Sequence, residues 1–166
     1  MEERRRVIAA NLEARIKTSA EREFYARNMI RKELVDKANN GDIEGIKMIL
    51  TEVAAEAEQT GCKPRATAEV RNDGGQSLLS IAAQNDYFDL ALWLLTYYKD
   101  LDKDRWDLLD GEISPEARVF KANPNSRDMK GWTCACIAVF HDSRKVLKLL
   151  LEHGGDPNIR SSYNKN

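Results

Sequence analysis

Two cysteines and two histidines in the second half of the sequence have the side chains of a metal site. On a helix, Cys134 and Cys136 point about 200° apart, so they cannot share one ion. Cys134 and His141 share a helix face, but with His153 elsewhere they fall short of the tetrahedral set that a structural zinc requires. We therefore predict no metal site and interpret the cysteines as packing residues, without the lowered pKa that a nucleophile needs.

The acidic segment KDLDKDRWDLLDGE resembles a calcium loop, because Asp100, Asp102 and Asp104 alternate in it. Such a loop needs glycine at its sixth position and glutamate at its twelfth. Counted from Asp100, these positions hold Arg105 and Gly111. We therefore expect a solvated acidic insertion, and we predict that the protein has no cofactor and no catalytic residue.

The same insertion contains a tryptophan with two interpretations. Ser114 followed by Pro115 predicts a short helix near its end. Trp106, with Leu108 and Leu109, either folds the insertion back onto the rest of the protein or anchors a partner.

Composition excludes several classes of function. The chain has 166 residues, of which 42% are apolar and 32% charged, with a net charge of −1. This charge provides no field to hold nucleic acid or an anionic membrane, and we expect neither as a partner. There is no apolar run of a secretory signal or a membrane span. Three cysteines are a poor disulfide framework, so we expect an intracellular, cytoplasmic protein.

The chain contains a repeated unit of 33 residues, because ANPNSR at 122–127 matches GDPNIR at 155–160. A shift of 56 places Gly75 on Gly131 and exceeds the period by 23 residues, and a third copy is found at a shift of 45, which exceeds it by 12. The sequence therefore predicts three repeats separated by two insertions. The repeats are at about 33–50, 66–95 and 122–155, and the insertions at about 51–65 and 96–121.

Each copy predicts two short helices. In the third copy, Thr133 is a plausible N-cap, Asp142-Ser143 separate the helices, and Val146, Leu149 and Leu150 belong to a wide apolar stripe. A helical hairpin of this size cannot bury its own stripe, so copies must stack. The predicted fold class is therefore all-α, a solenoid of stacked helical hairpins.

At these residues the sequence resembles the ankyrin repeat family, through Gly131-x-Thr133, Ile137-Ala138, Leu149-Leu150 and the ending GGDPN. The family's usual Thr-Pro-Leu-His appears as TCAC and SLLS, and glycine is missing at Asp86 and Asp142; these departures predict less regular and less stable repeats. The resemblance implies L-shaped units that bind other proteins without chemistry, with the partner on the hairpin tips and the inner face of the first helices.

The N-terminal segment 1–32 has neither glycine nor proline, and neither do the residues up to Asn40. Apolar residues recur every four positions, which predicts one long amphipathic helix. They are Ile8, Leu12, Ile16, Ala20 and Phe24. Two interpretations stay open: a cap over the first repeat, or a partner-binding or coiled-coil helix. Arg4 to Arg6 are interpreted as a solvated helix end.

At the other end, residues 161–166 align with the start of a further repeat. Val146, Leu149 and Leu150 would then remain an uncapped stacking face. We expect a fragment of a longer array, or self-association through this repeat or the N-terminal helix.

Partner-binding residues are predicted on the inner surface of the repeats. An exposed aromatic cluster beside a cation is typical of a hot spot. In the third repeat this group is Met129, Lys130, Trp132, Phe140 and His141, and packing of Trp132 against the second insertion is the alternative. Polar residues suited to a rim occupy the second repeat at Gln76, Gln84 and Asn85, and cations recur at Arg71, Arg127 and Arg160 to meet an acidic partner.

These patterns predict a protein-binding adaptor or scaffold and no enzyme. Two alternatives stay open: the non-catalytic targeting region of a larger enzyme, such as a kinase or ubiquitin ligase subunit, and a structural component of a cytoskeletal or axonemal assembly. The sequence does not identify the partner, because surfaces vary freely on one scaffold.

Overall fold

The computed structural model describes residues 2–104 and 112–156, with the backbone alone for residues 12–19. Every regular element within these ranges is a helix, so the predicted all-α class is confirmed. The helices are α1 (Glu2–Asn39), α2 (Ile43–Thr60), α3 (Leu78–Asn85), α4 (Phe88–Leu101), α5 (Pro115–Phe120), α6 (Cys134–Phe140) and α7 (Arg144–Glu152).

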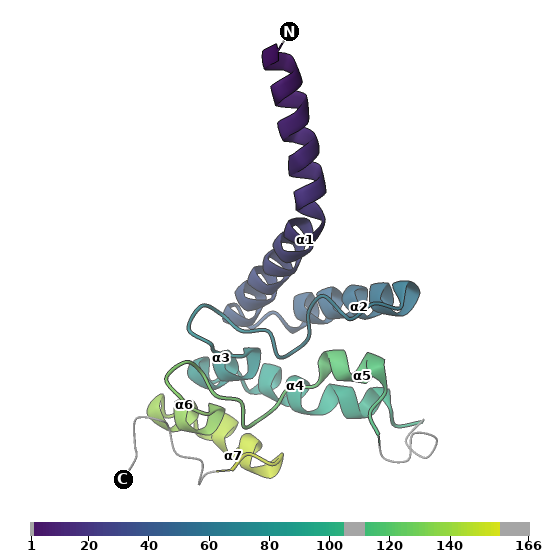
Figure 1. Cartoon of the computed structure of the whole chain (residues 1–166). Helices are drawn as coiled ribbons and strands as arrows, with labels where there is room; N and C mark the ends of the chain where they lie inside the picture. The colour runs from purple at the N-terminus through teal and green to yellow at the C-terminus, as the bar shows by residue number, and fades with distance from the viewer. Residues whose placement is uncertain (1, 105–111, 157–166) are drawn as a thin grey trace.

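The helices stack as successive pairs (Figure 1): the end of α1 with α2, α3 with α4, and α6 with α7. The first helices pack in one row, with α3 between α1 and α6, and the second helices in another, with α4 between α2 and α7. One continuous core fills the space between the rows. Its largest fully buried side chains include Leu34, Ile46, Leu78, Leu94 and Leu150. Each pair thus buries a stripe that it could not bury alone.

The two loops that precede α3 and α6 have the same geometry. The side-chain oxygen of Asn72 accepts hydrogen bonds from the amides of Gly74 and Gln76, and Asp128 caps its own loop in the same way. Gly75 and Gly131 share a left-handed conformation, with φ of 78° and 79°. A Cβ on Gly75 would lie 2.8 Å from the amide nitrogen of Met129, so the two loops approach each other as closely as glycine allows.

Small polar residues replace the tetrapeptide that the resemblance led us to expect. Ser77 and Thr133 are the N-caps of α3 and α6, which confirms the capping prediction for Thr133. The Ser77 hydroxyl lies 3.2 Å from that of buried Ser126, and the Ser80 hydroxyl lies 3.3 Å from the Cys134 thiol. These buried bonds join the second and third repeats, so the departures SLLS and TCAC match each other across the interface.

Asp86 and Asp142 occupy the turns between paired helices, at the positions where the sequence lacks the glycine that the resemblance led us to expect. Both adopt the left-handed conformation, with φ of 54° and 55°. Aspartate tolerates this region better than most side chains, although at some energetic cost. The turn geometry of the repeat is therefore kept without glycine.

The long helix predicted at the N-terminus is α1, and its last third is the first helix of the first repeat. Leu34 and Ala38 are fully buried. Of the predicted apolar stripe, Ile8 is 54% exposed and Phe24 is 74% exposed, so these two side chains do not cover the first repeat. The buried residues of α1 lie near its end, at Leu34 and Ala38. The earlier turns of the helix project away from the stack (Figure 1).

The second insertion packs on the second helices through α5. Phe120 of α5 contacts the rings of Trp93 and Tyr97 on α4, with centroids 6.2 and 5.0 Å away. Asp102 is buried and accepts hydrogen bonds from the amide and hydroxyl of Ser114, so for this residue the expectation of a solvated insertion is wrong. The predicted short helix is confirmed as α5, with Ser114 as its N-cap. Trp106, Leu108 and Leu109 lie outside the described residues.

One expectation about burial in the second helices needs correction, and equivalent positions of these helices differ in exposure. Val146, Leu149 and Leu150 are buried, because α7 packs against both α4 and α6, so they do not form an open stacking face. Met48 aligns with buried Leu149 but is 64% exposed on α2, whereas Trp93 at the same position is covered by Phe120. Among the described residues, none of the helices combines the length and hydropathy needed to cross a bilayer.

Candidate protein-binding surface

An aromatic cluster stands on the third repeat at the end of α6. The Phe140 ring lies 5.1 Å from the Trp132 ring and 5.1 Å from the His141 ring, measured between centroids. Phe140 is 68% exposed, and Met129 in the preceding loop is 77% exposed. A solvated aromatic ring held by other rings is already oriented, so a partner that covers it loses little side-chain freedom. The structure therefore brings together the aromatic residues that the sequence singled out.

Trp132 supports this cluster from below. It is half-buried and packs against the hydrophobic core, while its backbone amide is fixed by a 2.9 Å hydrogen bond to Asp128. Trp132 is therefore less exposed than the predicted aromatic cluster implied, because its ring packs against the core. Phe140 and His141 are the solvent-facing members of the cluster, and Lys130 is exposed on the adjoining loop.

The aromatic surface has one exposed member that the sequence did not indicate. Val139 is 64% exposed beside Phe140. The helical stripe of α6 assigns its core face to Ile137 and Ala138, which are buried. The exposure of Val139 could have been predicted from the sequence, because Val139 and Phe140 follow Ala138 and point away from the core face of the helix. We name Met129, Val139, Phe140 and His141, with Trp132 beneath them, the aromatic surface.

The three polar positions predicted in the second repeat differ in availability. Gln84 is exposed at the end of α3. Gln76 is half-buried and accepts a 3.0 Å hydrogen bond from Asn72, and the Asn85 amide donates to the carbonyl of Ile81. Gln76 and Asn85 thus use part of their hydrogen-bonding capacity inside the protein, so Gln84 is the better candidate for a rim contact.

One member of the predicted row of arginines forms hydrogen bonds inside the protein. The half-buried Arg71 guanidinium donates to the carbonyls of Gly75 and Arg127, and Arg31 of α1 donates to the carbonyl of Arg71 over 2.8 Å. These bonds connect each unit to the next, and the sequence did not indicate Arg31 because it lies inside a helix. Arg127 is exposed, whereas Arg160 lies outside the described residues. An acidic partner would therefore meet Arg127 more readily than Arg71.

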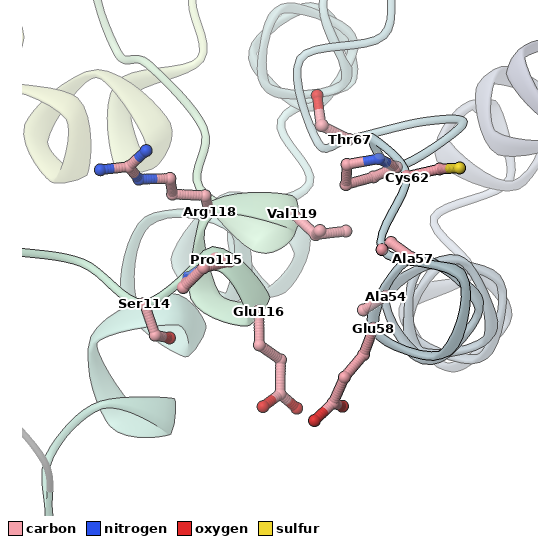
Figure 2. Close-up of a pocket in the computed structure, with 12 residues that line it drawn as sticks. Ala54, Ala57, Glu58, Cys62, Thr67, Ser114, Pro115, Glu116, Arg118 and Val119 are labelled. Carbon is pink, nitrogen blue, oxygen red and sulfur yellow. The ribbon is translucent and has the colours of Figure 1, made fainter.

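A separate hollow of about 580 Å³ lies between the two insertions (Figure 2). One wall is the end of α2 with Ala54 and Ala57, and the other is α5 with Val119. Figure 2 shows the side chains of Glu58 and Glu116 pointing toward each other at one opening. The hollow belongs to the side of the second helices, because α5 packs on α2 and α4.

A carboxylate and a thiol inside the stack have shifted pKa values. Burial raises the pKa of Glu69, whose carboxylate also accepts a hydrogen bond from the amide of Asn123 between the second and third repeats. Burial likewise raises the pKa of the Cys134 thiol, which keeps it protonated and unreactive. Among the described residues, no group of three or more His, Cys, Asp or Glu side chains is placed to hold a metal ion.

The sequence matches a known protein family. The family description "Ankyrin repeats (3 copies)" matches residues 34–161, which is most of the chain. No curated protein matches the sequence. The matched span begins at the buried end of α1 and includes all the other helices.

Proposed function

Because the chain belongs to the ankyrin repeat family, we propose that it is a non-catalytic adaptor that binds a partner protein through the aromatic surface of its third repeat. Ankyrin repeats generally mediate protein–protein interactions. The observation that supports this proposal most is Phe140, a large aromatic side chain that is 68% exposed yet held between two other rings. Aromatic residues, phenylalanine included, are enriched in protein–protein interfaces.

The mechanism is complementarity of shape and charge on a rigid surface. The partner covers Phe140, Val139 and Met129 and excludes water from them, while Arg127 and Gln84 provide polar contacts at the edge. An interface of standard size buries about 1,200–2,000 Å² in total, so the contact extends from the third repeat onto the second. An acidic patch on the partner fits the exposed guanidinium of Arg127 best.

A photoreactive phenylalanine analogue at position 140 tests this proposal in cells. The analogue replaces Phe140 in one protein and Met48 in a second, because Met48 is also exposed, at 64%, but lies on α2 away from the aromatic surface. After illumination, we expect discrete cross-linked products from position 140 that are missing from position 48. The same products from both positions, or from neither, would contradict a partner site at Phe140.

A second candidate function is favoured by the projecting part of α1. Val7 and Ile8 are each 54% exposed, and Tyr25 is 65% exposed, so the projecting part of the helix leaves apolar side chains uncovered that a partner could bury. We infer a role for this arm in docking to a filament or similar assembly. Cosedimentation with cytoskeletal filaments, with and without residues 1–20, separates this role from that of an adaptor: the shortened chain should stay in the supernatant.

A further inference from the structure

The hollow between the insertions is formed by small side chains and by a helix that the basic repeat does not contain. Ala54, Ala57 and Gly61 line the α2 side, so the walls of the hollow stay apart where larger residues would fill it. Gly61 ends α2 in a left-handed conformation with φ of 68°. The opposite wall is fixed, because Val119 and Phe120 of α5 are buried against the stack. The space is therefore part of the folded structure and does not depend on a flexible lid.

The size and lining of the hollow suit part of a peptide. Its volume of about 580 Å³ lies within the range of about 300–1,000 Å³ that is common for ligand sites. The alanines, Pro64 and Val119 make most of its interior apolar. Apolar side chains of a partner would gain free energy by leaving water for these walls.

The charge at its opening decides what kind of peptide fits. Glu58 and Glu116 are both exposed and converge there (Figure 2). Arg118 also lines the hollow, but its side chain points away from the two carboxylates (Figure 2). Among the side chains that the structure describes, neither glutamate forms an ion pair. By contrast, nearby Glu56 is paired with Arg65, 3.5 Å away. Two unneutralised carboxylates favour a cation, and the planar guanidinium of arginine can contact both of them at once.

We propose that this hollow binds a short peptide segment of a partner protein in which an apolar residue lies next to arginine or lysine. The apolar side chain enters between Ala57 and Val119, and the cation remains at the opening between Glu58 and Glu116. This site is distinct from the aromatic surface, because it lies on the second helices and the insertions. The protein would then hold two partner segments, one on each side of the stack.

Selection of random short peptides displayed on phage against the full chain tests the proposal. We expect enrichment of sequences that combine an apolar residue with arginine or lysine. Ala57→Phe should abolish this enrichment by filling the hollow, whereas Ala55→Phe on the exposed side of the same helix should retain it. Failure to enrich basic sequences, or their retention by Ala57→Phe, would overturn the proposal.

A charge test remains decisive if Ala57→Phe does not fold. With a synthetic copy of the enriched peptide, Glu58→Lys/Glu116→Lys should raise Kd by about tenfold or more, while the matched surface change Glu33→Lys/Glu52→Lys should leave Kd within about twofold. Added salt should weaken wild-type binding. An equal effect of the two double variants would reject the carboxylate pair. Sedimentation showing a dimer that Glu58→Lys/Glu116→Lys dissociates would reject a separate partner in favour of a second copy of this chain.

Discussion

The second and third repeats can be compared position by position, because their loops and inner helices have nearly the same backbone. Gly75 and Gly131 differ by 1° in φ, with values of 78° and 79°. On this shared backbone, the second repeat presents Gln76 to the inner surface and the third repeat presents Trp132. The difference separates two roles: the glycines and caps maintain the stack, while the side chains between them determine what the surface can bind.

The comparison also shows how the repeats depend on each other. The buried polar contacts of Ser80 with Cys134 and of Ser77 with Ser126 are pairs across the interface. Each repeat supplies one partner of these pairs. Changes that disturb the shared backbone should therefore affect both repeats, and changes at the aromatic surface should affect neither.

The largest effect is expected from the shared core. Leu94 is fully buried on α4, in the core between the row of first helices and the row of second helices. Leu94→Ala should lower the free energy of unfolding by about 2–5 kcal/mol, measured by urea denaturation, because it leaves a cavity. Leu92→Ala on the same helix is the control, since Leu92 is 36% exposed and should cost less. Equal losses would mean that α4 does not pack through Leu94.

A smaller loss is expected where the two loops touch. Gly75→Ala adds a methyl group 2.8 Å from the Met129 nitrogen at a left-handed position and should destabilise by about 1–3 kcal/mol. Gly61→Ala has a similar φ of 68° but no heavy atom within 4 Å of the added carbon, so it should show the conformational cost alone, about 1 kcal/mol. The difference between the variants measures the contact between repeats. If the two melting curves shift equally, the close approach contributes nothing.

A stabilising change is expected at the turns between helices. Asp86→Gly should raise the free energy of unfolding by up to about 1 kcal/mol, because glycine adopts the left-handed conformation without strain. The matching change Asp142→Gly should gain less, since Asp142 also pairs with Arg144 over 3.0 Å. Thermal melting of both variants checks this order, and a loss of stability in Asp86→Gly would show that its side chain is required.

The smallest effect is a dependence on pH at the contact between the second and third repeats. Burial raises the pKa of Glu69 above the value of 4.5 for an unperturbed side chain. The contribution of this group to stability is therefore complete below about pH 4.5 and is lost as the pH rises through the raised pKa of the folded state. Relative to the wild type, Glu69→Gln should gain stability across this window, since its oxygen can still accept the Asn123 bond. If wild type and Glu69→Gln differ in stability by the same amount at every pH, the raised pKa of this half-buried carboxylate is contradicted.

The repeat itself was predictable because the period of 33 fixes which residues must share an environment. That logic correctly placed the glycine loops, the Thr133 cap and the helical pairs. The period alone does not determine burial at Met48, because burial there depends on whether an insertion covers the position, as α5 covers Trp93. The same logic failed at Val146, because the contacts of α7 with α4 and α6 are enough to bury this residue without a further repeat.

The candidate sites were only partly predictable for the same reason. The aromatic surface lies in adjacent positions of one repeat, so sequence alignment could identify Trp132 and Phe140. The hollow is formed by Ala57 from one insertion and Val119 from the other. Their meeting depends on how α5 folds back onto α2, and no local pattern encodes that distance.

The most direct test of the central claim uses the partner that cross-links at position 140. Its Kd is measured for the wild type and for Phe140→Ala, and the free energy of unfolding is measured for the same two proteins. Because Phe140 is 68% exposed and contacts two neighbouring rings, its removal should lower the free energy of unfolding by about 1 kcal/mol or less. Its loss from the interface should nevertheless raise Kd by about tenfold or more, whereas Met48→Ala should leave Kd unchanged. An unchanged Kd for Phe140→Ala would contradict the account.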